Sequence, residues 1–293
     1  MEYTSQIIRR TMTLSVLMSV YKSERPEYLD RSLQSIISDQ TEKPDVVVLV
    51  QDGFLDNDLL RVINKWREIA GDKMVIIKNE TNLGLTKSLN EGLNVITTDL
   101  VARMDSDDIS CPERFEKQKR YLEQHPEIDI LGGAILEIDE NGEPLNNRYY
   151  PRDNKSVYKS IYKANPLAHP TVMMRMRLFE NGLRYNDKYK TNQDLALWFD
   201  AIFAGFNIGN LTDVILHFRR QSSVYRRRKK LKNLLREFNI YCHGIKKLYG
   251  PYSFKYVYPL SRLCLKLMPV FVVKWAYESH LRRVITDNSK NSK

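Results

Sequence analysis

Apolar runs alternate with helical patterns along the first part of the chain. Four runs have the apolar composition of buried strands: Leu14–Val20, Asp45–Val50, Met74–Lys78 and Leu100–Met104. Between them, apolar residues recur every three or four positions, which is the period of a helix with one buried face. The first helix is expected to begin at Pro26, because proline suits the first turn of a helix. Strands that alternate with such helices indicate β-α-β units around a mainly parallel sheet.

The pattern changes beyond the fourth strand. A long apolar run, Ile128–Ile138, is followed by Asn141-Gly142, a dipeptide that favours a hairpin turn. Asn165–Met174 is expected to be a loop that enters a strand, and Asp194–Phe203 an apolar-rich helix that opens with an acid. We therefore predict an α/β fold with a Rossmann-like, mainly parallel sheet flanked by helices.

Polar signals fall where the predicted strands end. They are Ser19–Tyr21, Gln51–Gly53, Asn79–Gly84 and Asp105–Asp108. In open α/β sheets, ligands bind at the carboxyl ends of the strands. The agreement of four strand ends therefore predicts a binding site at this edge.

The last of these signals is the richest in chemistry. Asp105, Asp107 and Asp108 place three carboxylates directly after a strand. Carboxylate oxygens are the ligands that Mg²⁺ and Mn²⁺ prefer, and such an ion also binds phosphates. The alternative is a solvated turn in which an aspartate caps the helix expected to start at Pro112-Glu113.

The composition is that of an ordinary soluble protein. Of its residues, 42% are hydrophobic and 28% are charged. With 293 residues, the chain is long enough for one large domain or for a main domain with an appendage. Cys111, Cys242 and Cys264 lie far apart, which argues against a disulfide framework or a zinc site and favours a reducing compartment. Thr11–Tyr21 faintly resembles a signal peptide but lacks a cleavage site, so we interpret it as the first strand. No run approaches the roughly 18 apolar residues of a membrane span.

The net charge of +10 is unevenly distributed. Residues 216–293 contain 19 lysines and arginines against three acids, a balance of +16, whereas residues 1–215 have a balance of −6. We therefore predict two regions, 1–215 as the main domain and 216–293 as a basic, amphipathic helical region. The basic region is expected to face a polyanion, either a membrane surface or nucleic acid.

Six motifs together carry a family resemblance. They are S-V-Y at 19–21, Q-D-G at 51–53, N-L-G-L-T-K-S-L-N-E-G at 82–92, A-R-M-D-S-D-D-I-S at 102–110, H-P-T-V at 169–172 and Q-D-L-A-L-W at 193–198. In this order the chain, over about residues 13–220, resembles the family 2 inverting glycosyltransferases of the GT-A fold. Among these it is most similar to bacterial enzymes that build O-antigens, capsules and exopolysaccharides.

The resemblance implies a binding site for a nucleoside-diphosphate sugar. Ser19 and Tyr21 would line the nucleotide pocket, and Asp52 would bond the uracil or ribose. The residues implied at this site are Ser19, Tyr21, Asp52, Asn82, Gly84, Lys87 and Asp105. Glycine at position 84 permits close approach of the backbone, and the Lys87 ammonium suits a phosphate.

The resemblance also implies a divalent cation, Mn²⁺ or Mg²⁺. Asp105 and Asp107 match the acids of the family that contact metal and ribose, with Asp107 as the direct metal ligand. Asp108 would instead cap the next helix. Family members often have a late histidine near the metal, but Phe218–Gln221 occupies that region here, so we assign no histidine ligand. Arg219 and Arg220 either meet phosphates or form a solvated basic face.

Asp194 matches the catalytic base of the family. Inversion needs a carboxylate that takes the proton from the acceptor hydroxyl. The family usually has a Glu-Asp pair at this point, whereas here the pair is Gln193-Asp194. The alternative for Asp194 is a plain helix N-cap. The resemblance further places His169, Gln193 and Trp198 on the acceptor side.

The resemblance implies transfer of a hexose, from a donor such as UDP-galactose or UDP-glucose, with inversion to a β-linkage. The acceptor would be a saccharide on a polyprenyl diphosphate lipid, and the enzyme would lie peripherally at the inner face of the cell membrane. One alternative is a sugar-1-phosphate nucleotidyltransferase, but Tyr21–Pro26 lacks the Gly- and Arg-rich loop of that class.

The other alternative is a non-catalytic protein that binds nucleic acid or a membrane. Aromatic and basic residues interleave at Tyr249–Tyr258, which would suit stacking on bases. The apolar residues between Leu263 and Trp275, interrupted by lysines, suit a membrane interface better. We therefore expect an anionic membrane surface, and no nucleic acid, as the partner of this region.

Overall fold

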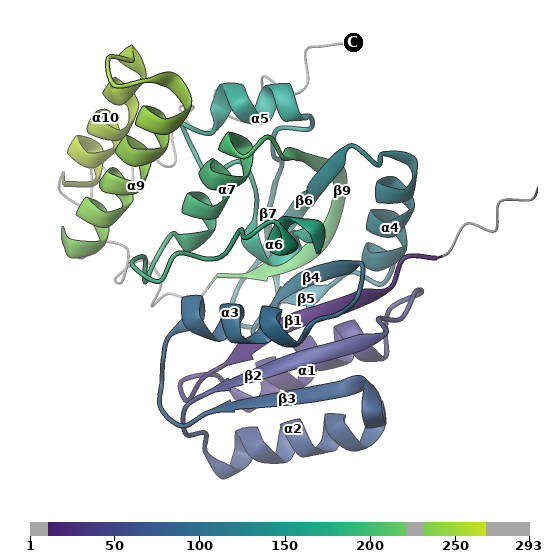
Figure 1. Cartoon of the computed structure of the whole chain (residues 1–293). Coiled ribbons are helices and arrows are strands. Elements are labelled where there is room, and N and C mark those ends of the chain that lie inside the picture. Colours follow the sequence, from purple (N-terminus) through teal and green to yellow (C-terminus); the bar gives the residue numbers. More distant parts are fainter. Residues whose placement is uncertain (1–10, 221–230, 268–293) are drawn as a thin grey trace, which may run out of the picture.

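The computed structural model describes residues 11–220 and 231–267, and in this part the strands form one nine-stranded sheet (Figure 1). The order is β3-β2-β1-β4-β8-β6-β9-β5, with β7 paired to β6. The strands are β1 (Leu14–Val20), β2 (Val46–Asp52), β3 (Met74–Asn79), β4 (Leu100–Asp105), β5 (Ile109–Ser110), β6 (Ile128–Ile138), β7 (Pro144–Arg148), β8 (Met173–Arg175) and β9 (Asn207–Arg219).

Helices connect and cover the strands. Those of the first 203 residues are α1 (Pro26–Ile37), α2 (Asn57–Ala70), α3 (Leu85–Val95), α4 (Arg114–Gln124), α5 (Asn154–Ser160), α6 (Arg177–Glu180) and α7 (Gln193–Phe203). They are followed by α9 (Leu231–Tyr249) and α10 (Val257–Leu267). As predicted, α1 begins at a proline, and its apolar residues lie on one buried face.

The first four strands are parallel, and their carboxyl ends meet at one edge of the sheet. Ser19 of β1 is in register with Val50 of β2 and with Asp105 of β4, and Asp52 of β2 pairs with Asn79 of β3. Beyond β4, strand β8 is antiparallel to both β4 and β6, while β6 and β9 are parallel. The predicted mainly parallel sheet with flanking helices is therefore confirmed.

Two hydrophobic cores lie on opposite faces of the sheet. Successive residues of a strand point to opposite sides, so Leu17 enters one core while Val16 and Met18 enter the other. Helices α1, α2 and α4 cover one face, and α3, α6 and α7 cover the other (Figure 1). The site residues at the strand ends thus stand on a scaffold that is packed from both sides.

The C-terminal helices join this scaffold directly. A Cβ added to Gly244 of α9 would lie 2.3 Å from the ring of Phe199 on α7, so these two helices pack in close contact. Lys247 of α9 also donates to Asp200 of α7 at 2.7 Å. The boundary predicted after residue 215 falls inside a strand, because β9 continues to Arg219. None of the described helices is long and apolar enough to cross a membrane.

Candidate active site

An acidic cluster lies at the carboxyl end of β4. Oxygen atoms of Asp105, Asp107 and Asp108 lie within 4.8 Å of one another. Burial, together with the negative charges of Asp105 and Glu24, raises the pKa of Asp107 to about 7. Crowded carboxylates of this kind are stabilised by a hard cation that shares their oxygens. The donor set therefore fits a divalent metal ion.

Asp108 has a structural partner that its sequence neighbours do not show. It is fully buried, and its Oδ1 atom accepts the backbone N–H of Arg219 at 2.8 Å. The expectation that Asp108 caps the next helix is wrong, because the N-cap of α4 is Glu113. Asp108 instead ties the acidic turn to the end of β9.

Arg219 also connects β9 to the acidic turn, which differs from the role that the sequence predicted for it. Its side chain is buried and donates through Nε to the carbonyl of Asp107 at 3.0 Å, and through Nη1 to the carbonyls of Asp139 and Glu140. Its guanidinium also lies 4.2 Å from the ring centroid of Tyr28. Both interpretations offered for Arg219, a phosphate contact and a solvated face, are therefore corrected: Arg219 positions the acidic turn from behind.

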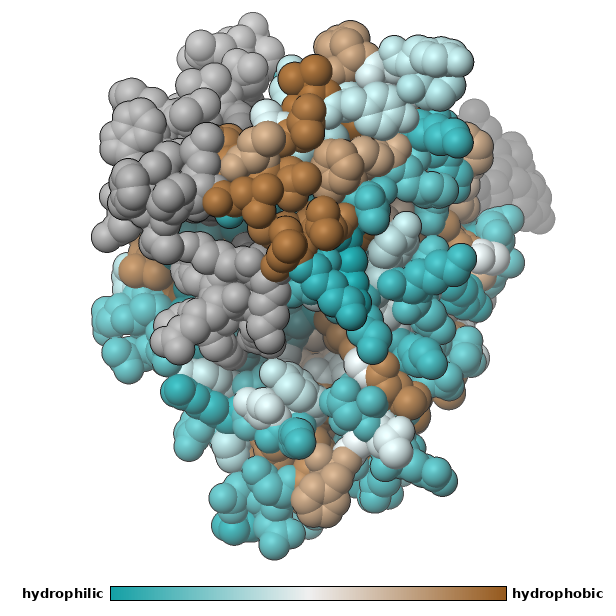
Figure 2. Space-filling model, turned by 90° about the vertical axis from the view of Figure 1, so that its left-hand side faces the viewer, coloured by the Kyte–Doolittle hydropathy of each residue, from teal (hydrophilic) through white to brown (hydrophobic). Residues whose placement is uncertain are grey.

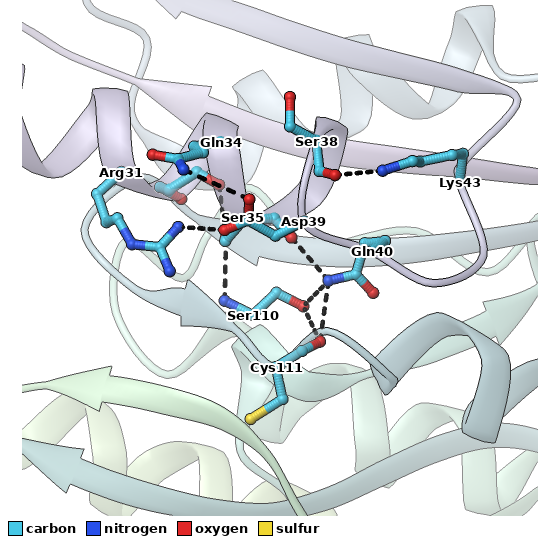
Figure 3. A network of polar contacts seen from close by, with 10 residues as sticks. Arg31, Gln34, Ser35, Ser38, Asp39, Gln40, Lys43, Ser110 and Cys111 are labelled. Carbon is cyan, nitrogen blue, oxygen red and sulfur yellow. Dashed lines mark hydrogen bonds and ion pairs between the residues drawn. The ribbon is translucent and has the colours of Figure 1, made fainter.

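A second network anchors the segment that follows the acidic turn (Figure 3). Gln40 donates through its side-chain amide to the carbonyls of Ser35 and Cys111, at 2.7 and 2.9 Å, and to the hydroxyl of Ser110. The backbone N–H of Ser110 in turn donates to the Ser35 hydroxyl at 3.0 Å. The end of α1 thus holds β5, so the turn that carries Asp107 and Asp108 is fixed on both sides.

Arg103 is a site residue that sequence reasoning passed over. It stands on β4, its side chain is 3% exposed, and it forms an ion pair with Asp105. Its positive charge also contributes to lowering the pKa of His169 and opposes the rise in the pKa of Asp194. In the sequence, the one feature that could have drawn attention to Arg103 was its charge inside an otherwise apolar strand. Arg103 therefore links the acidic cluster electrostatically to the second half of the site.

Asp52 organises the loop that precedes α3. Its two carboxylate oxygens accept the backbone N–H groups of Leu83 and Gly84, at 2.7 and 2.9 Å. Gly53 has φ +85°, and a Cβ at this position would lie 2.7 Å from the Asn82 nitrogen, so the two loops touch through their backbones. The contact of Asp52 with a nucleoside stays a prediction, while its observed contacts hold the loop at residues 82–84 in place.

The other residues predicted for the donor site lie around this loop. Asn82 and Lys87 are exposed, the latter in the first turn of α3, which starts after Gly84. Ser19 is half-buried beside Asp105, and Tyr21 is 37% exposed. The structure thus brings the predicted residues to neighbouring strand ends of one sheet. Their contacts with a donor stay predictions.

We expect Asp52→Ala to weaken nucleotide binding as well as stability. Two backbone donors lose their acceptor, which costs about 1–3 kcal/mol, and the loop at residues 82–84 loses its anchor. Asp56→Ala is the matched control, since Asp56 likewise accepts a backbone N–H, that of Leu59 at the start of α2. Urea unfolding should show a loss of stability in both variants, whereas calorimetry should show weaker UDP binding in Asp52→Ala alone. Equal UDP affinity in the two would contradict the assignment.

Asp194 lies in the first turn of α7, but it is not the N-cap. The helix begins at Gln193, and its N-cap is Asn192, which has φ 57°. The Oδ2 atom of Asp194 accepts a hydrogen bond from Asn165 at 2.5 Å. Burial raises the pKa of Asp194 above its ordinary value, although hydrogen bonds from backbone N–H groups and from Asn165 oppose this rise. The N-cap alternative is therefore wrong, and Asn165 is an orienting residue that the sequence did not reveal.

The three residues predicted on the acceptor side face the interior instead. Trp198 is 0% exposed, and its ring forms a T-shaped contact with that of His169, with the ring centroids 6.0 Å apart. His169 is buried, with its Nε2 atom 2.8 Å from the Tyr185 hydroxyl, and burial holds its pKa well below the ordinary value. Gln193 is also buried. In the structure these side chains support α7 from inside, and their place on the acceptor side stays a prediction.

The comparisons with known proteins identify the family of the chain. Residues 15–183 match the family described as glycosyl transferase family 2. The chain is 36% identical to the amylovoran biosynthesis glycosyltransferase AmsE of Erwinia amylovora, over 90% of this chain and 97% of that protein. It is 30% identical to the UDP-Gal:alpha-D-GlcNAc-diphosphoundecaprenol beta-1,3-galactosyltransferase of Escherichia coli, over 94% and 98%.

A solved structure shows the same fold. The crystal structure of S. aureus TarS 1-349 in complex with UDP aligns with a TM-score of 0.59 at 17% identity, covering 96% of this chain and 92% of that one. Its similarity identifies the fold as that of the GT-A glycosyltransferases. The chain belongs to glycosyl transferase family 2, and it is a glycosyltransferase. The predicted family and enzyme class are thereby confirmed, and the nucleotidyltransferase and non-catalytic alternatives are set aside.

Proposed function

We propose that this glycosyltransferase transfers a hexose from a UDP-sugar, such as UDP-galactose or UDP-glucose, to a saccharide on a polyprenyl diphosphate lipid. The linkage formed is β, and the product serves bacterial surface polysaccharide synthesis. The observation that carries the proposal is a carboxylate cluster at the strand ends together with a separate carboxylate on α7. The E. coli relative, whose name specifies UDP-galactose and a lipid diphosphate acceptor, supports the choice of substrates.

The acidic cluster is the proposed metal site. Asp105 and Asp107 would hold Mn²⁺ or Mg²⁺, while Asp108 and Arg219 fix the turn that presents them. A bound divalent cation offsets the negative charge that develops on a departing diphosphate. The Arg103 guanidinium, buried beneath Asp105, keeps that carboxylate in place.

Asp194 is the proposed general base. Its carboxylate takes the proton from the acceptor hydroxyl as that oxygen attacks the anomeric carbon, and the bond from this carbon to the diphosphate oxygen breaks. Attack opposite the leaving group inverts the anomeric centre. Burial raises the pKa of Asp194, which makes its carboxylate a stronger base than one in water. Asn165 holds one of its oxygens, so the carboxylate is oriented before the acceptor arrives.

A lipid-linked acceptor implies that the enzyme acts at a membrane surface. We place the enzyme peripherally at the inner face of the cell membrane, with the basic region 216–293 towards anionic lipid. The balance of +16 in this region supports the placement, because basic residues near an anionic leaflet are attracted to it.

A donor and acceptor panel tests the proposed reaction. Purified protein is mixed with Mn²⁺ and one UDP-sugar at a time, and UDP release is measured with and without a GlcNAc-diphosphate-lipid analogue. We expect one UDP-hexose to be consumed in an acceptor-dependent way and NMR of the product to show a β-linkage. An α-linked product, or turnover with sugar donors of other nucleotides alone, would overturn it.

A further inference from the structure

Helix α10 turns several apolar residues towards solvent. Its exposed apolar residues are Val257, Leu260, Cys264, Leu265 and Leu267. Four of them, Val257, Leu260, Cys264 and Leu267, are spaced three or four positions apart and form one stripe along the helix. We call these four residues the α10 stripe. Val257, Leu260 and Leu267 are 63%, 52% and 57% exposed. A helix on the surface of a water-soluble protein normally turns such residues inward.

The charged side chains of α10 are directed towards α9. Arg262 donates to Glu237 of α9 at 2.9 Å, and Lys266 forms an ion pair with the same carboxylate. Burial would raise the pKa of Glu237, but the two cations outweigh it and lower that pKa. Ion pairs thus join α10 to α9, and the helix presents its apolar side outward.

Further apolar residues are exposed on the segments next to α10 in the chain and on α9. In the turn that leads into α10, Tyr252 is 99% exposed and Phe254 is 71% exposed. On α9, Leu231 and Leu235 are 56% and 45% exposed. Figure 2 shows apolar side chains gathered on one face of the molecule. An exposed apolar patch of this extent marks an interaction site rather than ordinary surface.

The surroundings of the patch match a lipid interface. Tyr162, Tyr249 and Phe254 surround the ammonium of Lys255, which lies 4.5–5.0 Å from their ring centroids. Tyrosines and lysines at the edge of an apolar surface are typical of the boundary between headgroups and acyl chains. Lys232 and Lys246 of α9 are exposed, and residues 216–293 carry the balance of +16. This charge complements an anionic bilayer.

We propose that the α10 stripe, with Tyr252 and Phe254, docks on an anionic bilayer and enters the boundary between headgroups and acyl chains. The inference rests on the proposed function, in which the enzyme acts at a membrane, and it names the surface that binds the membrane. Because α9 packs on α7 through Gly244 and Phe199, the docked stripe would hold the helix that carries Asp194 close to the membrane. A lipid-linked acceptor is confined to that layer, so docking raises its concentration near the base.

Vesicle flotation of the full chain tests the proposal. We expect binding to vesicles of phosphatidylcholine with phosphatidylglycerol, weaker binding without phosphatidylglycerol, and weaker binding in high salt. The double variant Leu260→Ser/Leu267→Ser should lower the vesicle partition coefficient by about tenfold or more, because two leucines no longer gain from burial. Ile69→Ser is the matched control, since Ile69 is 55% exposed on the distant helix α2. Ile69→Ser should bind like the unmodified chain.

Further measurements distinguish membrane docking from a loss of catalysis and from a dimer contact at the stripe. Tryptophan emission of Phe254→Trp should shift to the blue with vesicles and be quenched by brominated lipid. Turnover on a water-soluble acceptor analogue should be equal in the stripe variant and the unmodified chain, so a failed reaction and a failed docking are told apart. Unchanged flotation of the stripe variant would overturn the proposal. So would a dimer that forms without vesicles and dissociates in that variant, since a second copy would then cover the stripe.

Discussion

Asp107→Asn is expected to lower turnover by at least about a thousandfold. The amide keeps the shape of the side chain but removes one of the anionic oxygens that lie within 4.8 Å of those of Asp105 and Asp108. The affinity for UDP in the presence of Mn²⁺ should fall, while the affinity without metal changes little. Steady-state UDP release and calorimetric titration of UDP, with and without Mn²⁺, measure the two effects.

The fold of this variant should remain intact. Asp107→Asn removes a charge that is crowded by Asp105 and Glu24, so the melting temperature should not fall. Asp213→Asn is the control, because Asp213 is an exposed carboxylate whose described partner is Lys117. It should retain normal turnover. Full activity of the unmodified enzyme in excess EDTA would refute the metal site, as would undiminished activity of Asp107→Asn.

The elements of the sheet could be predicted because their signals are local. Leu14–Val20 is an apolar run whose bounds the structure repeats without change, and the following runs differ only at their ends. Parallel strands bring their carboxyl ends to one edge, so Asp52 and Asp105 could be placed near each other from topology alone. Composition and period determine such features, and both are read within a window of a few residues.

The contacts that hold the site could not be predicted, because they join distant parts of the chain. Asp108 and Arg219 lie 111 positions apart, and Asn165 and Asp194 lie 29 apart. No local pattern pairs such residues, so Arg219 was interpreted as a phosphate contact or a solvated face, and Asn165 was given no role. The start of α7 was misplaced for a different reason. The helix begins at Gln193, after Asn192 in a left-handed conformation, and the acid at position 194 had been taken as its first residue.

The C-terminal helices show a third limit of prediction from the sequence. The sequence indicated an interfacial segment from Leu263 to Trp275, of which the part beyond Leu267 lies outside the described residues. Within α10, the stripe begins earlier, at Val257, and Leu263 is half-buried. A helical pattern tells which residues share a face, but the face turned to α9 was decided by Glu237, which draws Arg262 and Lys266 inward.

Gln193→Glu should move the acid limb of the pH–rate profile upward. The enzyme is active when Asp194 is deprotonated, so activity is lost as pH falls through the pKa of this group, which burial already raises. A neighbouring negative charge disfavours the ionised form and raises that pKa further. The profile of kcat for the variant and the unmodified enzyme measures the shift. A limb that stays in place, or moves to lower pH, would show that another group governs it.

Asp194→Asn is expected to reduce turnover by about a hundredfold or more, the usual effect of losing a general base. The amide still accepts a hydrogen bond from Asn165 but takes up no proton at neutral pH, so the affinity for the UDP-sugar should change little. Asp200→Asn is the matched control on the same helix, where Asp200 pairs with Lys247, and it should retain turnover. The loss should appear in kcat, with the melting temperature unchanged or higher, because a half-buried carboxylate is replaced by a neutral group. Near-normal turnover of Asp194→Asn would mean that another residue is the base, even though the family assignment would stand.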